Sequence, residues 1–247
     1  MKLLVDIGNH RIKWARQGPA GLSAHGSCEW RKADLEATLD HAWGPATVPT
    51  LISAASVAPP RVIGMVQEWI TRHWACPLHL VGIGEAASAI CHGYREPRQL
   101  GIDRWLALVA AWEREHRPCC VVDCGTAITL DVITGAGVHA GGVIAPGLHT
   151  MHHALSRHAH ALDAHPPAEP VLLGRDTDEC IVSGCYHAAC GVINELTEQV
   201  LELHGPDMAL QLTGGDAEHL QVGLRHPYQH IPDLILQGLA AIPEPQA

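Results

Sequence analysis

The first part of the chain begins with two short segments of strand character joined by a turn. Residues 3–6 form an apolar run that ends at Asp-Ile-Gly-Asn, and residues 11–15 alternate apolar and charged side chains. This pattern predicts a β-hairpin, because alternation with period two places one face of a strand in a core. By the same criteria, we expect further strands at residues 51–53 and 78–81, and helices at residues 61–73 and 103–115.

The same kind of hairpin is predicted again at the middle of the chain. Residues 120–123 and 128–134 are apolar runs on either side of Cys124-Gly-Thr. The segments Val5-Asp6-Ile-Gly8 and Val122-Asp123-Cys-Gly125 match at an offset of 123 − 6 = 117 residues. The match indicates two similar halves, residues 1–117 and 118–247, although four residues can also coincide by chance. Later strands are expected at residues 138–145 and 210–212, and helices at 148–156, 176–202 and 234–241.

Composition and charge narrow the class of protein. The chain has 247 residues, with 16 Lys and Arg against 26 Asp and Glu, and a formal charge of −10. We expect no nucleic-acid partner, because such binding needs clustered positive charge. The longest apolar run, residues 105–112, is far below the roughly 18–20 residues that span a bilayer, so no membrane segment is expected. The early Asp6 argues against a signal peptide, and nine cysteines without a Cys-x-x-Cys pair favour reduced thiols in the cytoplasm.

The repeated Asp-x-Gly turn carries the first chemical indication. Glycine lets the backbone approach phosphate oxygens, and a carboxylate can hold a hydrated Mg²⁺. The alternative is that Asp and Gly are common turn formers after strands. Two copies, at Asp6 and Asp123, together with Gly214-Gly-Asp216, favour phosphate binding. Lys13 would point toward a transferred phosphoryl group, or it would be a solvated lysine at a strand edge.

The segment Gly101-Ile-Asp-Arg104 places a carboxylate at the start of a helix. Asp103 could accept the proton of an acceptor hydroxyl in phosphoryl transfer, or it could only cap the helix beside Arg104.

Two other motifs are set aside. Gly82-Ile-Gly-Glu-Ala-Ala87 fits a dinucleotide-binding fingerprint, but the acid about 20 residues onward, Asp103, opens a helix instead of ending a strand. His149 and His153 have metal-ligand spacing, but histidine is frequent along this chain and the turn between them has no carboxylate, so we expect no metal there.

Together, the ordered motifs resemble the type III pantothenate kinase family, within the superfamily that includes actin and the sugar and acetate kinases. Each segment is weak alone, whereas their order over nearly the whole chain is specific. The matching segments are Asp6-Ile-Gly-Asn-His-Arg-Ile-Lys13, Tyr94-Arg-Glu-Pro-Arg-Gln-Leu-Gly-Ile-Asp-Arg104, Asp123-Cys-Gly-Thr-Ala-Ile-Thr-Leu-Asp131, Gly141-Gly-Val-Ile-Ala-Pro-Gly147, Thr177 with Ser183-Gly184, and Thr213-Gly-Gly-Asp216.

The resemblance implies an α/β fold of two RNase H-like (actin-like ATPase) domains, each a mixed sheet flanked by helices, with a ligand cleft between them. It implies transfer of the ATP γ-phosphate to pantothenate, the first step of coenzyme A biosynthesis, with Asp103 as proton acceptor. Mg²⁺ would accompany ATP, Asp123 would bind a monovalent cation (K⁺ or NH₄⁺), and the protein would be a homodimer. The residues implied for ATP are Asp6, Gly8, Asn9, His10, Arg11, Lys13 and Thr126, and those for pantothenate are Tyr94, Gly101, Ile102, Asp103, Arg104 and Thr177, the last across the dimer interface.

One residue departs from the family pattern. His10 stands where the family usually has Thr or Ser, so a bulky imidazole replaces a small hydroxyl near the expected phosphates. We expect activity to be retained with weakened ATP affinity. Two other functions stay open: a non-catalytic relative, such as an accessory factor in gene regulation, and another phosphotransferase or phosphohydrolase of the superfamily.

Overall fold

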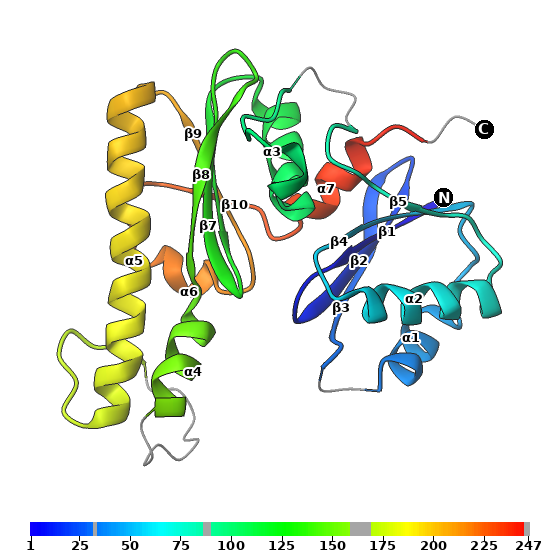
Figure 1. Cartoon of the computed structure of the whole chain (residues 1–247), viewed down its shortest axis with the longest axis horizontal. Coiled ribbons are helices and arrows are strands. Elements are labelled where there is room, and N and C mark those ends of the chain that lie inside the picture. Colours follow the sequence, from blue (N-terminus) through cyan, green and yellow to red (C-terminus); the bar gives the residue numbers. More distant parts are fainter. Residues whose placement is uncertain (32–33, 86–89, 159–168, 245–247) are drawn as a thin grey trace. The chain divides into compact units, whose positions relative to one another are not determined.

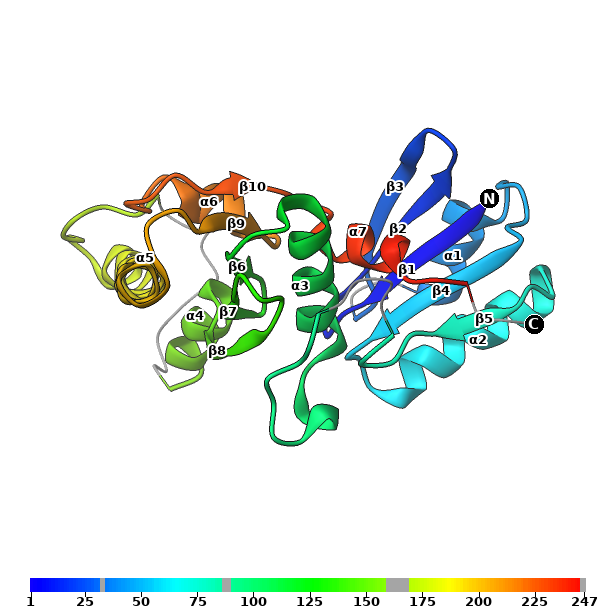
Figure 2. The same cartoon turned by 90° about the horizontal axis from the view of Figure 1, so that it is seen from above.

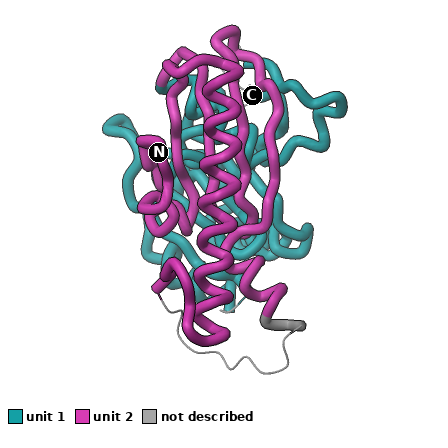
Figure 3. Tube along the Cα trace, turned by 90° about the vertical axis from the view of Figure 1, so that its left-hand side faces the viewer, with its two compact units in different colours: residues 1–114, 233–247 teal, residues 115–232 magenta. Residues whose placement is uncertain are grey.

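The chain folds into two compact units, which are described here separately. The computed structural model describes residues 1–31, 34–85, 90–158 and 169–244 (Figure 1). Unit 1 comprises residues 1–114 and 233–247, and unit 2 comprises residues 115–232 (Figure 3). The predicted second half was residues 118–247, whereas residues 233–247 are compact with unit 1, because α7 (Leu234–Ala241) packs against β1 and β4.

Unit 1 contains a five-stranded mixed sheet with the strand order β3-β2-β1-β4-β5. The first three strands form an antiparallel meander, and β4 and β5 run parallel to β1. The strands are β1 (Lys2–Ile7), β2 (Arg11–Gly18), β3 (Gly21–Glu29), β4 (Leu51–Ser56) and β5 (Leu78–Leu80).

The two faces of this sheet are covered by different helices (Figure 2). Leu3, Val5 and Ile7 face α1 (Leu35–Trp43) and α2 (Pro60–His73), where Trp14, Trp43 and Trp69 make edge-to-face contacts. On the other face, Leu4 packs with Leu106 of α3 (Ile102–Glu115) and with Leu236 and Leu239 of α7. The alternation along β1 therefore supplies two cores, as expected for a strand buried on both faces.

Unit 2 contains a second five-stranded mixed sheet, with the strand order β10-β9-β6-β7-β8. One face packs against α5, where Cys120, Val122, Leu130, Leu212 and Ile193 are buried together. The strands are β6 (Cys119–Cys124), β7 (Ala127–Ile133), β8 (His139–Pro146), β9 (Ala209–Thr213) and β10 (Gln229–His230), and the helices are α4 (Leu148–His158), α5 (Thr177–His204) and α6 (Ala217–Gln221).

The two sheets have the same topology. In each, the first strand is central, the second and third continue as an antiparallel meander, and the fourth pairs parallel to the first. The prediction of two similar halves is thereby confirmed. Asp6 and Asp123 occupy corresponding places, near the carboxyl end of the central strand and opposite a residue of the parallel neighbour.

All nine cysteines are free thiols. Burial raises the pKa of Cys119 to about 12, so this thiol stays protonated at neutral pH. In the described part of the chain no helix is both long enough and apolar enough to cross a bilayer. Ala86 and Ala87 of the dinucleotide-binding fingerprint that was set aside lie outside the described residues.

Helix α7 approaches α3 closely at Gly238. A Cβ at position 238 would overlap the backbone carbonyl of Leu106, which cannot move without displacing α3. Gly238→Ala should therefore lower the free energy of unfolding by about 1–3 kcal/mol. Gly191→Ala on α5 is the matched control, since its Cβ meets nothing and alanine favours the helix by about 0.5–1 kcal/mol. Urea denaturation measures both, and equal stability of Gly238→Ala and wild type would contradict this packing.

Candidate active site

The Asp6–Lys13 turn of unit 1 is fixed by hydrogen bonds from within and from outside. The Gly8 amide donates to the Arg11 carbonyl at 2.9 Å and closes the turn. The indole Nε1 of Trp30 donates to the Gly8 carbonyl at 2.9 Å, and Nε of Arg31 donates to the Asn9 carbonyl at 3.3 Å. The backbone of the turn is thus held in one conformation.

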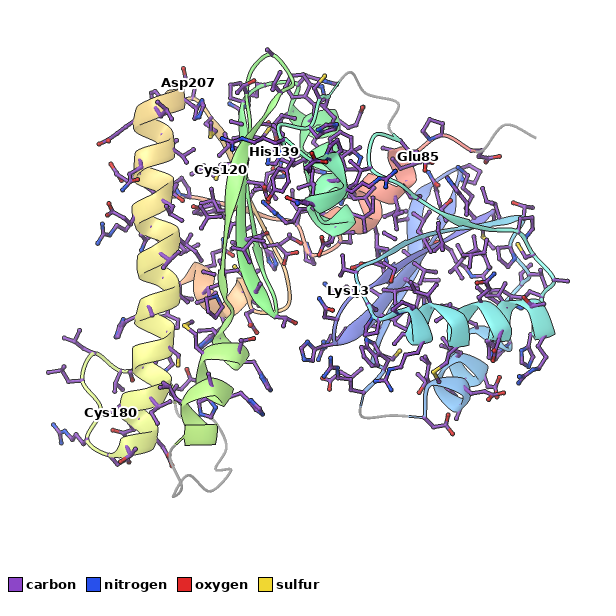
Figure 4. The ribbon with its side chains drawn as sticks, viewed as in Figure 1. Lys13, Glu85, Cys120, His139, Cys180 and Asp207 are labelled. Atoms are coloured by element: carbon purple, nitrogen blue, oxygen red, sulfur yellow. The ribbon has the colours of Figure 1, made fainter. Side chains whose placement is uncertain are left out.

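The side chains of this turn are arranged by the β1–β2 register. Asp6 is buried and lies directly opposite Lys13, so the two opposite charges share a face of the sheet. Asn9 and His10 are exposed at the tip. Arg11 is also exposed and pairs with Glu29 at 2.9 Å. Figure 4 shows Lys13 on β2. The sequence-predicted ATP residues of unit 1 therefore lie in one continuous turn.

Asp103 lies at the start of α3, in a setting that fixes its carboxylate. Oδ1 of Asp103 accepts the backbone N–H of Arg104 at 2.8 Å. A Cβ at position 101 would collide with the same oxygen, so Gly101 is the residue that leaves room for it. Trp105 N–H donates to the Gly101 carbonyl at 3.0 Å and begins the helical hydrogen bonds. The Gly101–Arg104 segment therefore positions one carboxylate oxygen through backbone geometry.

Arg104 and Tyr94 form a pair next to this carboxylate. Arg104 is 6% exposed, and its Nη1 donates to the Tyr94 hydroxyl at 2.6 Å. The guanidinium also lies over the Tyr94 ring, 5.5 Å from the ring centre, which is a favourable cation–π distance. Asp103, whose carboxylate can accept a proton, is thus followed directly on α3 by Arg104, whose guanidinium can bind an anion.

Asp123 is the penultimate residue of β6 in unit 2, and Gly125 and Gly214 lie next to its carboxylate. A Cβ at Gly214 would overlap Oδ1 of Asp123 and the Cys124 carbonyl, and Gly214 has φ = +100°, a conformation that favours glycine. The Asp216 amide donates to the Cys124 carbonyl at 2.9 Å, joining the loop after β9 to the end of β6. Burial raises the pKa of the Cys124 thiol, and the nearby carboxylates of Asp123 and Asp216 raise it further.

Thr126 occupies the turn after Asp123 and is held by the segment that begins α4. The Gly147 amide and the Thr150 hydroxyl both donate to the Thr126 carbonyl, at 3.0 and 2.6 Å. Thr150 was not expected from the sequence. The one sequence feature that could have indicated its role is its position in the first turn of the helix after Pro146-Gly147.

Thr177 lies on a different element from Asp123 and Thr126. It is the first residue of α5 and is exposed, beside Asp176, whose carboxylate accepts the Glu179 amide at 2.8 Å. Figure 4 shows Cys180, one turn further along, near the same end of α5.

The donor set of these turns fits hard cations. Asp6 and Asp123 offer carboxylate oxygens, the ligands that Mg²⁺ and similar cations prefer. Among the described residues, no three His, Cys, Asp or Glu side chains gather as a metal centre. A cation held by either carboxylate would complete its ligand set with phosphate oxygens, backbone carbonyls or water.

Comparison with solved structures identifies the fold. A Campylobacter jejuni protein named as a candidate Baf family transcriptional activator superposes with a TM-score of 0.57 at 19% identity, over 96% of this chain and 95% of that one. MreB 5 of Spiroplasma citri superposes with a TM-score of 0.51 at 9% identity, over 97% and 94%. These similarities confirm the expected class of two RNase H-like domains.

Sequence comparison identifies the family. The model of the type III pantothenate kinase family matches residues 2–199. The type III pantothenate kinase of Nitrosococcus oceani is 36% identical, over 98% of this chain and 93% of that protein. The enzyme of the same name from Halorhodospira halophila is also 36% identical, over 97% and 96%. The chain belongs to the type III pantothenate kinase family.

Proposed function

We propose that this protein transfers the γ-phosphate of ATP to the primary hydroxyl of pantothenate, the first step of coenzyme A biosynthesis. The observation that carries the proposal is the Asp103–Arg104–Tyr94 arrangement at the start of α3, in a chain of this family. Phosphoryl transfer needs positioning and charge neutralisation more than covalent chemistry, and the fixed turns of this fold supply both.

Asp103 is the proposed proton acceptor. As the hydroxyl oxygen of pantothenate attacks the γ-phosphorus, its proton passes to the Asp103 carboxylate and ADP leaves. The Arg104 guanidinium matches the carboxylate of pantothenate in charge and shape. We assign Tyr94, Gly101 and Ile102 to the same substrate, with Thr177 contributed through a dimer.

The proposed ATP contacts come from both Asp-x-Gly turns. We assign ATP to the turn from Asp6 to Lys13 and to Thr126. These ATP residues are Asp6, Gly8, Asn9, His10, Arg11, Lys13 and Thr126. Mg²⁺ bound with ATP neutralises phosphate charge, and the Asp6 carboxylate is placed to hold it through water. We assign a monovalent cation, K⁺ or NH₄⁺, to Asp123.

We further propose a homodimer in the cytoplasm. Leu172 and Leu173 are each 81% exposed and Val171 is 41% exposed, and three residues separate Leu173 from Thr177. Consecutive apolar side chains in water favour burial against a partner. The nine free thiols suit a reducing compartment.

A non-catalytic relative is the alternative. That function would not require Lys13, Asp103 or Arg104, yet all three are present together with Asp6 and Asp123. A different phosphotransferase would not require Tyr94 or the Gly101–Arg104 segment.

Release of ADP from ATP tests the activity. We expect turnover only when pantothenate is present, and faster turnover in potassium than in sodium buffer. A coupled ADP assay with a control lacking pantothenate measures both. Pantothenate-independent hydrolysis would favour a phosphohydrolase, and no turnover in either buffer would favour the non-catalytic alternative.

Two substitutions test Asp103. Asp103→Asn should lower kcat by about 10²–10⁴, because the amide cannot accept the proton. Gly101→Ala should lower kcat by about tenfold to a hundredfold by displacing Oδ1 of Asp103. Glu113→Gln removes an exposed carboxylate from the same helix and should keep the wild-type rate. Steady-state kinetics with a circular dichroism check of folding measures all three, and an active Asp103→Asn enzyme would exclude the role.

The dimer is tested by light scattering after size-exclusion chromatography. We expect twice the mass of the 26.5 kDa chain for the wild type and a shift toward monomer for Leu172→Ser/Leu173→Ser. Leu203→Ser, which changes a leucine of 78% exposure at the other end of α5, is the control. A monomeric wild type would overturn this part of the proposal.

A further inference from the structure

Two arginines lie over one tryptophan beside the Asp6–Lys13 turn. The guanidinium carbons of Arg31 and Arg61 are 4.9 and 5.7 Å from the centre of the Trp30 ring. Trp30 itself is 8% exposed and is tied to the turn through its bond to the Gly8 carbonyl. The ring therefore fixes two positive charges close to the turn, within the distance at which cation–π attraction operates.

Arg31 and Arg61 differ from Arg11, the arginine within the turn, in their ion pairing. Arg11 is paired with Glu29 at 2.9 Å. By contrast, within the described ranges no carboxylate lies at ion-pair distance from Arg31 or Arg61. Both side chains are exposed, and the chain as a whole carries an excess of acidic residues. Two like charges beside one ring repel each other, and an anion bound near them relieves that repulsion.

The first turn of α2 adds to the positive potential at this edge of the sheet. Strands β1 and β4 are parallel, so their carboxyl ends lie at the same edge, and the Val57 amide donates to the Ile7 carbonyl at 3.1 Å. Helix α2 begins directly after, at Pro60, with no side chain capping its N-terminus. Arg61 is in this first turn. The dipole of α2 and the charge of Arg61 each favour an anion near the start of this helix.

We propose that Arg31 and Arg61 form an anion subsite that binds the terminal phosphates of the nucleotide beside the Asp6–Lys13 turn. This inference rests on the proposed function for the identity of the anion. The family usually has a Thr or Ser hydroxyl at position 10, where this chain has His10. The guanidiniums of Arg31 and Arg61 would supply other hydrogen-bond donors to the phosphates, because a guanidinium binds phosphate through paired N–H groups. Arg31 is already oriented by its bond to the Asn9 carbonyl.

The alternative is a purely structural role, in which the two arginines only shield the Trp30 ring. Substitution of each arginine by glutamine distinguishes phosphate binding from this structural role. Arg31→Gln removes both a charge and the hydrogen bond to Asn9, so it can act through the turn. Arg61→Gln removes a charge without touching a hydrogen bond of the turn. A loss of phosphate binding in Arg61→Gln therefore reports on the subsite itself.

The subsite is tested by calorimetric titration of the full-length protein with inorganic tripolyphosphate. Adenosine, which lacks phosphate, is the control ligand. We expect Arg61→Gln to weaken tripolyphosphate binding several-fold and Arg31→Gln/Arg61→Gln to weaken it at least about tenfold, or 1.4 kcal/mol. Adenosine binding should stay unchanged. Arg72→Gln, an exposed arginine of the same helix that pairs with Glu36, should bind tripolyphosphate as the wild type does.

The outcomes separate this inference from the proposed function. Wild-type tripolyphosphate affinity in Arg61→Gln overturns the subsite, whether or not the enzyme phosphorylates pantothenate. Weakened tripolyphosphate binding together with no pantothenate-dependent ADP release supports the subsite and rejects the proposed function. Thermal melting of each variant shows whether Trp30 packing is kept, and lower stability with full tripolyphosphate affinity means a structural role only.

Discussion

The structure depends on one arrangement that occurs in both units: a carboxylate near the end of the central strand, followed by a glycine-containing turn. The sheet topology enforces it, since the antiparallel hairpin turns the chain back while the parallel strand ends at the same edge. The carboxylate alone would repel a nucleotide. A cation between carboxylate and phosphate would reverse the sign of that interaction, which is why the proposed function includes Mg²⁺ with ATP.

Much of the fold could be predicted from local patterns. The hairpins at Asp6 and Asp123 and the helices α2, α3 and α5 follow from periodicity and turn residues, and the structure confirms them. Strand β3 (Gly21–Glu29) was not predicted, because it is an exposed edge strand of small and polar residues without an apolar face. Helix α1 (Leu35–Trp43) was also missed, since nine residues give only a short apolar stripe. The place of α7 in unit 1 depends on packing against α3 at Gly238, which no local pattern encodes.

The candidate site, like the fold, could be predicted only where its residues are consecutive in the sequence. Asp-x-Gly and Gly101–Arg104 were identifiable because their chemistry is contained in a few consecutive residues. The steric relation of Gly101 to the Asp103 carboxylate, and of Gly214 to Asp123, required coordinates. The group of Trp30, Arg31 and Arg61 could not be predicted from the sequence, because its members come from the segment just after β3 and from the first turn of α2. The substitution at His10, in contrast, was visible only against the family pattern.

The most direct test of this account is ATP affinity measured by calorimetry with Mg²⁺ present and with Mg²⁺ removed by a chelator. Wild type and Asp6→Asn would be compared, with Asp207→Asn as an exposed control carboxylate. The account predicts that Asp6→Asn weakens binding of ATP with Mg²⁺ by about tenfold and leaves binding of metal-free ATP equal or tighter, because a repelling charge is lost. Unchanged affinity with Mg²⁺, or equal weakening under both conditions, would contradict it.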